Sequence, residues 1–374
     1  MAGLPVHRQS GVALLAALIL IMVLMFILGN IFYRHQIDIS QTSQALHRDQ
    51  ALLLALSGEN WARQMLEDDN VDYDHFGETW AQAIPAMPVD GGMINGCISD
   101  LQGRFNLNSL KAFDTNKKLN DALNDKNASE PVVWNQLLAL LEIPVYPGRV
   151  ETIIDWLDAD SALVGTSGAE QDDYAMLLPP RMIANEMMVE PSELASVMGY
   201  EIFEVQALMP WITALPDKTH ININTASDEL LIALGGDLDT QFRDAVVANR
   251  PFEKLSDFYT SIDSELSLSA PDAAANRWPK SLVDITTNYF QLYIEVLLGD
   301  ARIEVKSIIN RVIDPDGVKT VIISRDITSV PASLPKDSGS NLQTETDKTD
   351  SGEDSDNALE NTEMQPACLM IEAF

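Results

Sequence analysis

The chain has 374 residues, with 24 Lys and Arg against 56 Asp and Glu and a formal net charge of −32. So few basic residues argue against a protein that holds nucleic-acid phosphates through clustered positive charge. The length is sufficient for more than one folding unit. The two cysteines form no CxxC or Cys/His spacing, so a structural zinc site is not expected.

The first element is an apolar run from Val12 to Leu28 with no charged or polar residue. Its 17 residues can cross a membrane as a helix, at the short end of the usual range. No small-residue cleavage site follows the run, which argues against an ordinary secretory signal. His7 and Arg8 precede it and favour a cytoplasmic N-terminus, with the rest of the chain on the far side of the membrane. The simplest interpretation is a single-pass anchor.

The leader before this run, residues 1–11, allows a more specific interpretation. It ends in Gly11 directly against the apolar residues, which resembles the signal of prepilins. The resemblance implies cleavage after Gly11 by a membrane prepilin peptidase and methylation of the new N-terminus, Val12. Most prepilins carry Glu at the fifth mature position, where this chain has Ala16. The minor pseudopilin K (GspK) family of type II secretion systems typically lacks that Glu, which fits a subunit with no neighbour ahead of it.

Helical composition continues from residue 34 to 67, because Ala, Leu, Gln, Arg and Glu dominate and no Pro occurs. Gly58 is the first break in the pattern. We therefore expect one spine helix over 12–67, with about 12–33 in the membrane and a length of roughly 80 Å at 1.5 Å per residue. The alternative is an anchor, a linker and a separate helix. Four apolar residues after the membrane part fall near helical spacing: Leu46, Leu53, Leu56 and Trp61.

Strand patterns occur on both sides of a long helical region. The last three are joined by short turns, Gly299-Asp300 and Asp314 to Gly317, which is typical of an antiparallel meander. A sheet packed on a spine helix is the arrangement of a pilin head, so we expect a head made of 68–110 and 285–330. The predicted strands cover 92–100, 289–298, 301–312 and 318–327.

The residues between the two parts of the head, 111–284, are predicted to form an inserted, mostly helical domain. Thr225 is the expected cap of one of its helices, with Asp228 as the acid of a capping box. The segments DLQGRFNLNSL (100–110) and ININTA (221–226) resemble pseudopilin K, whose members carry a large helical insertion. The other helical patterns cover 131–141, 149–157 and 191–198, and a further helix follows 252–258.

The predicted fold class is therefore α+β: a pilin-like fold with a long N-terminal transmembrane helix, an antiparallel sheet and the inserted domain. The segment ININTASDELLIALGG within that domain also resembles the helix-hairpin-helix of DNA-uptake proteins, related in turn to SAM-like helical folds. Such a module binds phosphate on hairpin amides with help from basic residues. Here Asp237 and Asp239 follow the glycines, and Arg243 stands almost alone. We expect protein contact and no nucleic acid; a membrane-anchored periplasmic DNA-binding protein is the alternative.

The densest acidic loop between the helical patterns is a candidate calcium site. Calcium prefers six to eight oxygen ligands from carboxylates and carbonyls. The loop is not an EF-hand, because its sixth and twelfth positions are Leu163 and Ala169. The residues alone leave a solvated acidic loop open. The D-x-D…G-A-E-x-D pattern resembles pseudopilin K, whose members bind calcium there, and this implies the following candidate ligands: Asp158, Asp160, Glu170, Asp172, Asp173 and Asn185.

The two cysteines, Cys97 and Cys368, form a disulfide or remain separate thiols. A disulfide would close a loop of ~270 residues, for which the chain-entropy model gives roughly 5 kcal/mol. Residues 331–374 are rich in Ser, Thr, Asp, Glu and Asn, which is typical of a disordered acidic tail. That tail is either functional or a solvated spacer.

Nothing in the sequence indicates an enzyme. Four of the five histidines lie in or beside the leader and the spine, and no G-x-S-x-G motif accompanies the fifth, His220.

The resemblance to pseudopilin K covers about 9–328. It implies a protein of the inner membrane with its C-terminal domain in the periplasm, which joins minor pseudopilins I, J and H at the tip of the pseudopilus. There it would prime assembly and cap the filament during protein secretion. A membrane-anchored periplasmic binding protein that never assembles is the alternative from a different class.

Overall fold

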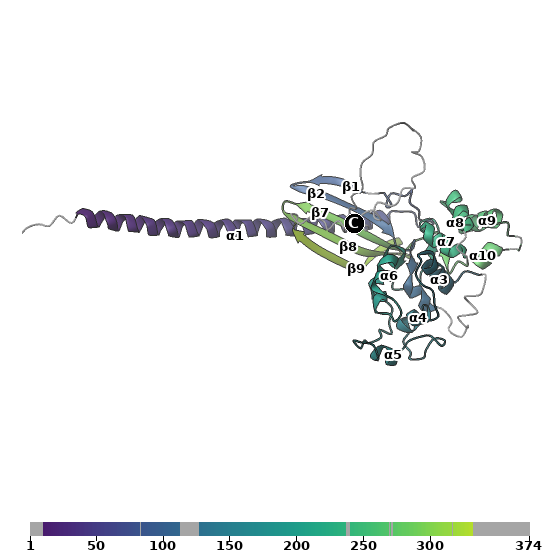
Figure 1. Cartoon of the computed structure of the whole chain (residues 1–374). Helices are drawn as coiled ribbons and strands as arrows, with labels where there is room; N and C mark the ends of the chain where they lie inside the picture. The colour runs from purple at the N-terminus through teal and green to yellow at the C-terminus, as the bar shows by residue number, and fades with distance from the viewer. Residues whose placement is uncertain are drawn as a thin grey trace, which may run out of the picture.

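The computed structural model describes residues 10–82, 84–112, 127–236, 240–268, 270, 272–315 and 317–331. One long helix, α1 (Ser10–Glu67), projects from a head that contains the other described elements (Figure 1). Within these residues, α1 is the one helix long and apolar enough to cross a membrane. The prediction of a single spine helix is therefore confirmed. Residues 1–9 of the predicted leader and 332–374 of the predicted tail lie outside the described residues.

The last part of α1 packs on the head sheet through small side chains, which let a sheet approach a helix closely. The face that it buries consists of Ala51, Ala55, Glu59, Ala62 and Leu66. The apolar residues singled out in the sequence lie elsewhere: Leu46, Leu53 and Trp61 are 54%, 65% and 48% exposed. The helix therefore has two apolar faces, and the bulkier one points away from the head.

Gly58 does not interrupt α1. A Cβ at this position would lie 3.0 Å from Cδ1 of Ile294 and 3.3 Å from Cδ1 of Ile94. The glycine thus makes room for two side chains of the sheet. Glycine lowers the stability of a helix through its backbone entropy, and here the packing of α1 on the sheet compensates that loss.

The head sheet has five antiparallel strands in the order β1-β2-β7-β8-β9. Four of these strands were predicted: β2 and β7 have the predicted bounds, and β8 and β9 extend beyond the predicted ranges 301–312 and 318–327 by at most four residues. The sequence did not predict β1, because it contains Pro85 and Pro88, which disfavour a strand. Prolines are tolerated in a strand at the edge of a sheet, and β1 is an edge strand. The bounds are β1 (Ile84–Val89), β2 (Gly92–Asp100), β7 (Tyr289–Leu298), β8 (Ala301–Asp314) and β9 (Gly317–Pro331).

The insertion forms a second body with its own core at the end of the head away from the free part of α1 (Figure 1). Two short parallel strand pairs, β3 with β4 and β5 with β6, join distant segments. Its helices are α3 (Glu130–Leu140), α4 (Glu151–Leu157), α5 (Gln171–Ala175), α6 (Ile202–Leu208), α7 (Asp228–Gly235), α8 (Gln241–Asn249), α9 (Leu255–Glu265) and α10 (Ala273–Arg277). Its 3₁₀ turns are η1 (Leu107–Ala112), η2 (Pro191–Ser196) and η3 (Met209–Trp211), and its strands are β3 (Phe105–Asn106), β4 (Ile212–Thr213), β5 (Ile221–Asn222) and β6 (Val283–Asp284).

Two local predictions in the insertion were wrong. The segment expected as a helix over 191–198 is the 3₁₀ turn η2. The cap of α7 is Ser227, whose hydroxyl accepts the N–H of Leu230 at 3.3 Å, rather than Thr225. The hydroxyl of Thr225 instead donates to Asp100 at the end of β2. A tertiary hydrogen bond therefore replaces the helix cap that the local sequence predicted.

That contact belongs to a buried network that joins head and insertion. Oδ2 of Asp100 accepts hydrogen bonds from Thr225 (2.5 Å), Thr287 (2.6 Å) and Asn222 (3.1 Å). The amide of Asn222 also donates to the backbone oxygen of Asp74 at 3.2 Å. Thus the ININTA and DLQG segments, which stood out in the sequence, meet where the two bodies connect.

Candidate calcium site

The acidic loop after α4 is held from beneath by Asp155. Its carboxylate accepts the N–H groups of Val164 (2.9 Å) and Ala169 (2.7 Å). A Cβ on Gly168 would lie 2.0 Å from Oδ2 of Asp155, so this close approach requires glycine. Asp155 therefore fixes the loop's shape, a role that sequence reasoning missed; the only signal was its place at the end of an apolar helix.

The loop brings together three of the predicted ligands, Asp158, Asp160 and Glu170. One carboxylate oxygen of each lies within 4.8 Å of the others. Asn185 joins them: its amide donates to the backbone oxygen of Asp160 at 3.3 Å. Its φ of 50° is a left-handed conformation that Asn adopts more readily than most residues.

Several oxygens at this place are buried without a hydrogen-bond partner. They are Oδ1 of Asp158, both carboxylate oxygens of Glu170 and Oδ1 of Asn185. Buried polar groups are nearly always paired, so unpaired ones require an explanation. All four are hard oxygen ligands of the type that calcium prefers. The residues present therefore fit a calcium ion.

The electrostatics of the loop also favour a bound cation. Burial, and after it the nearby carboxylates, raises the pKa of Asp158 and of Glu170. Burial likewise raises the pKa of Asp155 to about 7, although two backbone N–H groups oppose it. Carboxylates crowded in this way repel one another, and a divalent cation would relieve the repulsion.

Two predicted ligands are not brought to this group. The carboxylate of Asp173 accepts the N–H of Glu170 at 3.1 Å and so stabilises the start of α5. Asp172 is exposed and also lies outside the cluster. Adjacent residues at a helix start point in different directions, which the one-dimensional acidic pattern does not reveal.

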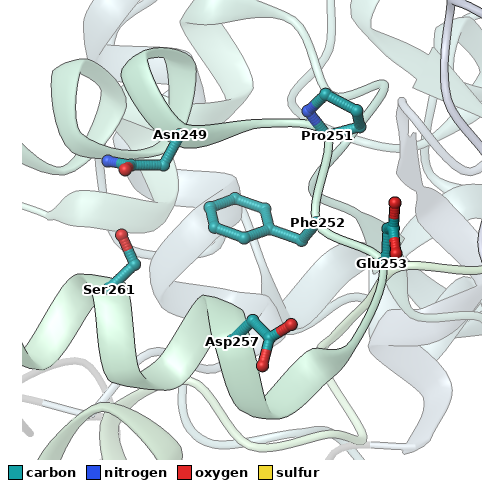
Figure 2. Close-up of a pocket in the computed structure, with 6 residues that line it drawn as sticks. All are labelled: Asn249, Pro251, Phe252, Glu253, Asp257 and Ser261. Atoms are coloured by element: carbon teal, nitrogen blue, oxygen red, sulfur yellow. The ribbon is translucent and has the colours of Figure 1, made fainter.

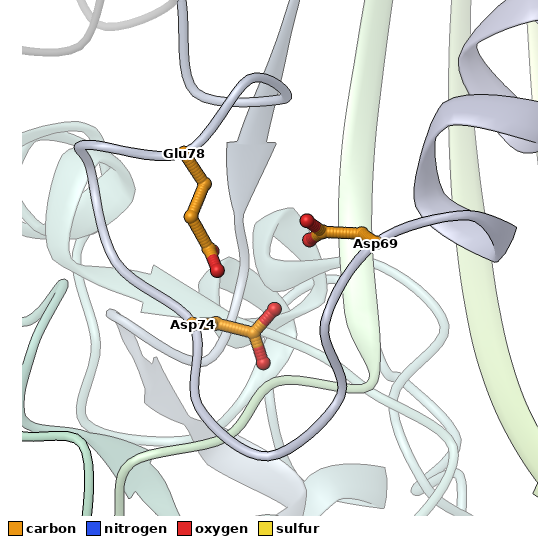
Figure 3. Close-up of side chains that lie close together, drawn as sticks. All are labelled: Asp69, Asp74 and Glu78. Carbon is orange, nitrogen blue, oxygen red and sulfur yellow. The ribbon is translucent and has the colours of Figure 1, made fainter.

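A second acidic cluster, Asp69, Asp74 and Glu78, lies where α1 leads into the head (Figure 3). Arg311 of β8 already supplies its positive charge. One of its guanidinium nitrogens lies 2.6 Å from both carboxylate oxygens of Asp74, and another lies 3.5 Å from Asp69. We therefore assign this cluster to the buried network between head and insertion and not to a metal.

After the helix-hairpin-helix-like segment, an open pocket lies between the end of α8 and α9 (Figure 2). Its charged lining residues are Glu253 and Asp257, which would repel phosphate. Arg243 nearby is paired with Asp228 at 3.0 Å. This geometry gives the DNA-binding alternative no support.

Of the two cysteines, only Cys97 belongs to the described residues. It is 2% exposed and disulfide-bonded. Cys368 lies outside the described residues, so the pairing of Cys97 with Cys368 stays a prediction.

A helix long and apolar enough to cross a membrane, a pilin-like sheet packed on its end and a helical insertion together define a pilin-like protein with an enlarged head. Two profiles described as type II secretion system protein K match residues 103–217 and 221–278. Type II secretion system protein K of Aeromonas hydrophila is 32% identical over 82% of this chain and 94% of its own length. The Pseudomonas aeruginosa protein of that name is 30% identical, over 88% and 96%.

The chain belongs to the type II secretion system protein K family. Its fold is similar to a chain in the crystal structure of the GspK-GspI-GspJ complex from enterotoxigenic Escherichia coli. The TM-score is 0.62 and the identity 23%, over 77% of this chain and 99% of that one.

Proposed function

We propose that this protein is the minor pseudopilin at the tip of the type II secretion pseudopilus, where it initiates assembly and caps the filament. The observation that carries the proposal is the position of the insertion, at the end of the head away from the free part of α1 (Figure 1). A subunit stacked above would meet the insertion in place of a spine helix. Ala16, where prepilins mostly have Glu, also suits a subunit with no neighbour ahead.

The proposed partners are the minor pseudopilins I, J and H. A solved structure of similar fold was determined as a GspK-GspI-GspJ complex. The exposed face of α1 with Leu46, Leu53 and Trp61 offers these partners an apolar surface in the part of the helix beyond the membrane. Contiguous apolar surface left exposed on a folded chain is typical of an interface.

The N-terminal segment supports a proposal for processing and location. We propose cleavage after Gly11 by a prepilin peptidase and methylation of Val12, with α1 anchored in the inner membrane and the head in the periplasm. The family resemblance and the apolar composition of residues 12–28 support this. No catalytic role and no nucleic-acid partner are proposed.

Calcium is proposed to bind at Asp158, Asp160 and Glu170, with Asn185 beside them. Because it would bind only the folded loop, it would stabilise the insertion by mass action.

The first experiment is the intact mass and N-terminal sequence of the protein from membranes that contain the peptidase. A chain that starts at methylated Val12 would support the assembly mechanism, and an intact Met1 would contradict it. The second is co-purification with pseudopilins I and J. Failure to form a complex would leave the anchored periplasmic binding protein as the better hypothesis.

A further inference from the structure

The loop that follows α5 presents large apolar side chains to solvent. Met176, Leu178 and Met182 are 81%, 96% and 82% exposed. Leu163 before α5 and Val189 after the loop are also exposed. A single exposed apolar residue is ordinary, but three within seven consecutive residues form a surface that is typical of an interaction site. We name residues 176–182 the apolar loop.

Hydrogen bonds hold the apolar loop at both ends. The backbone oxygen of Tyr174 accepts the N–H of Arg181 at 3.1 Å. The side chain of Gln171 donates to the backbone oxygen of Arg181 at 3.4 Å and accepts the N–H of Ile183 at 3.2 Å. Between these ends, Leu177 packs against the core of the insertion, while the residues on either side of it are exposed. The exposure is therefore a property of the folded loop.

The chain before and after the apolar loop is strongly acidic. Residues 158–193 contain eight Asp and Glu against one basic residue, Arg181, which gives a net charge of −7. Asn185, just after the loop, donates to the backbone oxygen of Asp160 at 3.3 Å, so acids from both stretches lie on the same part of the insertion. Glu186 and Glu190 beside the loop are exposed. An apolar surface with an acidic border complements a partner that is apolar and basic.

We propose that the apolar loop is a docking site for a segment of another protein whose apolar residues are flanked by Lys or Arg. Met176, Leu178 and Met182 would contact the apolar residues of that segment, and the bordering carboxylates would attract its basic residues. Met suits this role because its flexible, polarizable side chain adapts to different apolar shapes. The proposal requires no particular position in a filament, so it can hold or fail separately from the proposed function.

Charge and position favour this occupant over others. A second copy of the chain would bring two surfaces of the same negative sign together, and an anionic lipid headgroup would meet the same repulsion. In Figure 1, α5 lies at the border of the insertion, away from the head sheet and from α1. The partner therefore differs from subunits that would pack along the exposed face of α1.

The test measures the binding of a synthetic amphipathic helix, with a Leu face bordered by Lys, to the full-length protein in phosphatidylcholine nanodiscs. Detergent is avoided because it would cover the apolar loop. Fluorescence anisotropy of the labelled peptide gives the affinity, and empty nanodiscs give the lipid background. The Lys peptide is expected to bind and its Glu counterpart is not. Equal binding of both peptides, or binding of the Lys peptide no stronger than the background, would overturn the proposal.

The decisive variant replaces Met176, Leu178 and Met182 by Ser, which removes the apolar contacts and keeps every charge. It should weaken peptide binding at least tenfold. The control carries Ile323→Ser and Ile327→Ser in β9, where both residues are 44% exposed, and should bind like the wild type. An equal loss in both variants, or unchanged affinity of the triple variant, would show that the acidity of the chain and not the apolar loop holds the peptide.

Two further measurements complete the test. Leu178→Ser alone should melt like the wild type, because the side chain makes few contacts, and should bind the peptide several-fold more weakly; it remains as the test if the triple variant fails to fold. Flotation with phosphatidylglycerol vesicles and sedimentation of the protein address the other occupants. Vesicle binding or self-association that the triple variant loses would assign the loop to a membrane or to a second copy, and would refute the proposal.

Discussion

Unpaired oxygens are the most informative feature of the calcium loop at the scale of single residues. Glu170 is 7% exposed, and neither of its carboxylate oxygens has a hydrogen-bond partner, whereas Asp155 beneath it is satisfied by two backbone N–H groups. One carboxylate therefore shapes the loop and another is free to bind a cation. The same division separates Asp158 from Asp173, which stabilises the start of α5.

We expect Glu170→Gln to weaken calcium binding at least tenfold, because it removes a buried negative charge from the cluster. Calcium at 100 times its dissociation constant should stabilise the wild type by about 2.7 kcal/mol. The measurement is the melting temperature with calcium and with a chelator. Asp172→Asn is the matched control, since Asp172 is exposed outside the cluster. An equal loss in both variants would contradict the ligand assignment.

The shifted pKa of Glu59 should make the contact between α1 and the sheet depend on pH. Burial by itself raises the pKa of Glu59, but hydrogen bonds from Arg325 and Ser307 and the charge of Arg325 outweigh it, so the net pKa is lowered. A lowered carboxyl pKa contributes stability above the unfolded value of about 4.5, and that stability is lost as pH falls through the folded pKa.

The expected result is therefore a destabilising effect of the variant that is present at neutral pH and fades in acid. At pH 7, Glu59→Gln should cost about 2 kcal/mol, the usual size for hydrogen bonds to a charged group. As pH falls below the unfolded value and through the lowered folded-state pKa, the difference from the wild type should shrink, because the wild-type carboxyl of Glu59 takes up a proton as well. Chemical unfolding in a series of buffers from pH 7 downward measures this, and a difference that stays constant over the series would refute it.

At the scale of elements, α1 works as a two-faced helix. The small face with Ala51, Ala55 and Ala62 fits the sheet, and the bulky face with Leu53 and Trp61 does not touch it. A long helix that stays straight past Gly58 owes this to the side chains of the sheet that occupy the space beside the glycine. The helix therefore depends on the sheet at one face and remains available to neighbours at the other.

Gly58→Leu should destabilise the protein by about 1–3 kcal/mol, because the new side chain overpacks the contact with Ile294 and Ile94. Ser57→Leu, one residue earlier on the exposed side, is the control and should have little effect on stability. Thermal unfolding in detergent compares them. If both variants melt like the wild type, Gly58 does not set the helix-to-sheet distance.

The bulky face is expected to matter for assembly. Trp61→Ala should lower the affinity for pseudopilins I and J by about 30-fold, the effect of losing about 2 kcal/mol at an aromatic contact. The melting temperature should barely change, since Trp61 is 48% exposed. Asn60→Ala on the neighbouring exposed position is the control. Unchanged binding of Trp61→Ala would exclude this face from the interface.

At the scale of the whole molecule, the buried network decides how the insertion sits on the head. Asn222 donates to Asp100, Thr287 and the backbone of Asp74, and its oxygen accepts the N–H of Asn224. Asn222→Ala should cost about 3 kcal/mol, because it leaves several buried groups unpaired. Calorimetry should then show the head and insertion melting separately; one sharp transition would contradict the role of the network as their joint.

Much of the architecture was predictable from local patterns. The apolar run and the proline-free composition after it predicted α1, and alternation bounded by short turns predicted β7 to the residue. The acidic loop was predictable as a candidate site because carboxylates clustered in the sequence. Its ligand set was not, since hydrogen bonding to backbone N–H groups diverted Asp173 to a helix start and left Asp158 and Glu170 unpaired.

By itself, the sequence determined a helix long and apolar enough to cross a membrane, the strand meander, the inserted helical region and the similarity to protein K, because periodicity, turns and motifs are properties of residues close together in the chain. Only the tertiary structure decided which face of α1 meets the sheet, that Ser227 and not Thr225 caps α7, and that Arg311 neutralises Asp69 and Asp74. Each of these depends on a partner more than ten residues away or on a choice between equivalent local partners. Burial decides between the partners, because leaving a polar group unpaired in the interior costs more free energy than losing a helix cap on the surface.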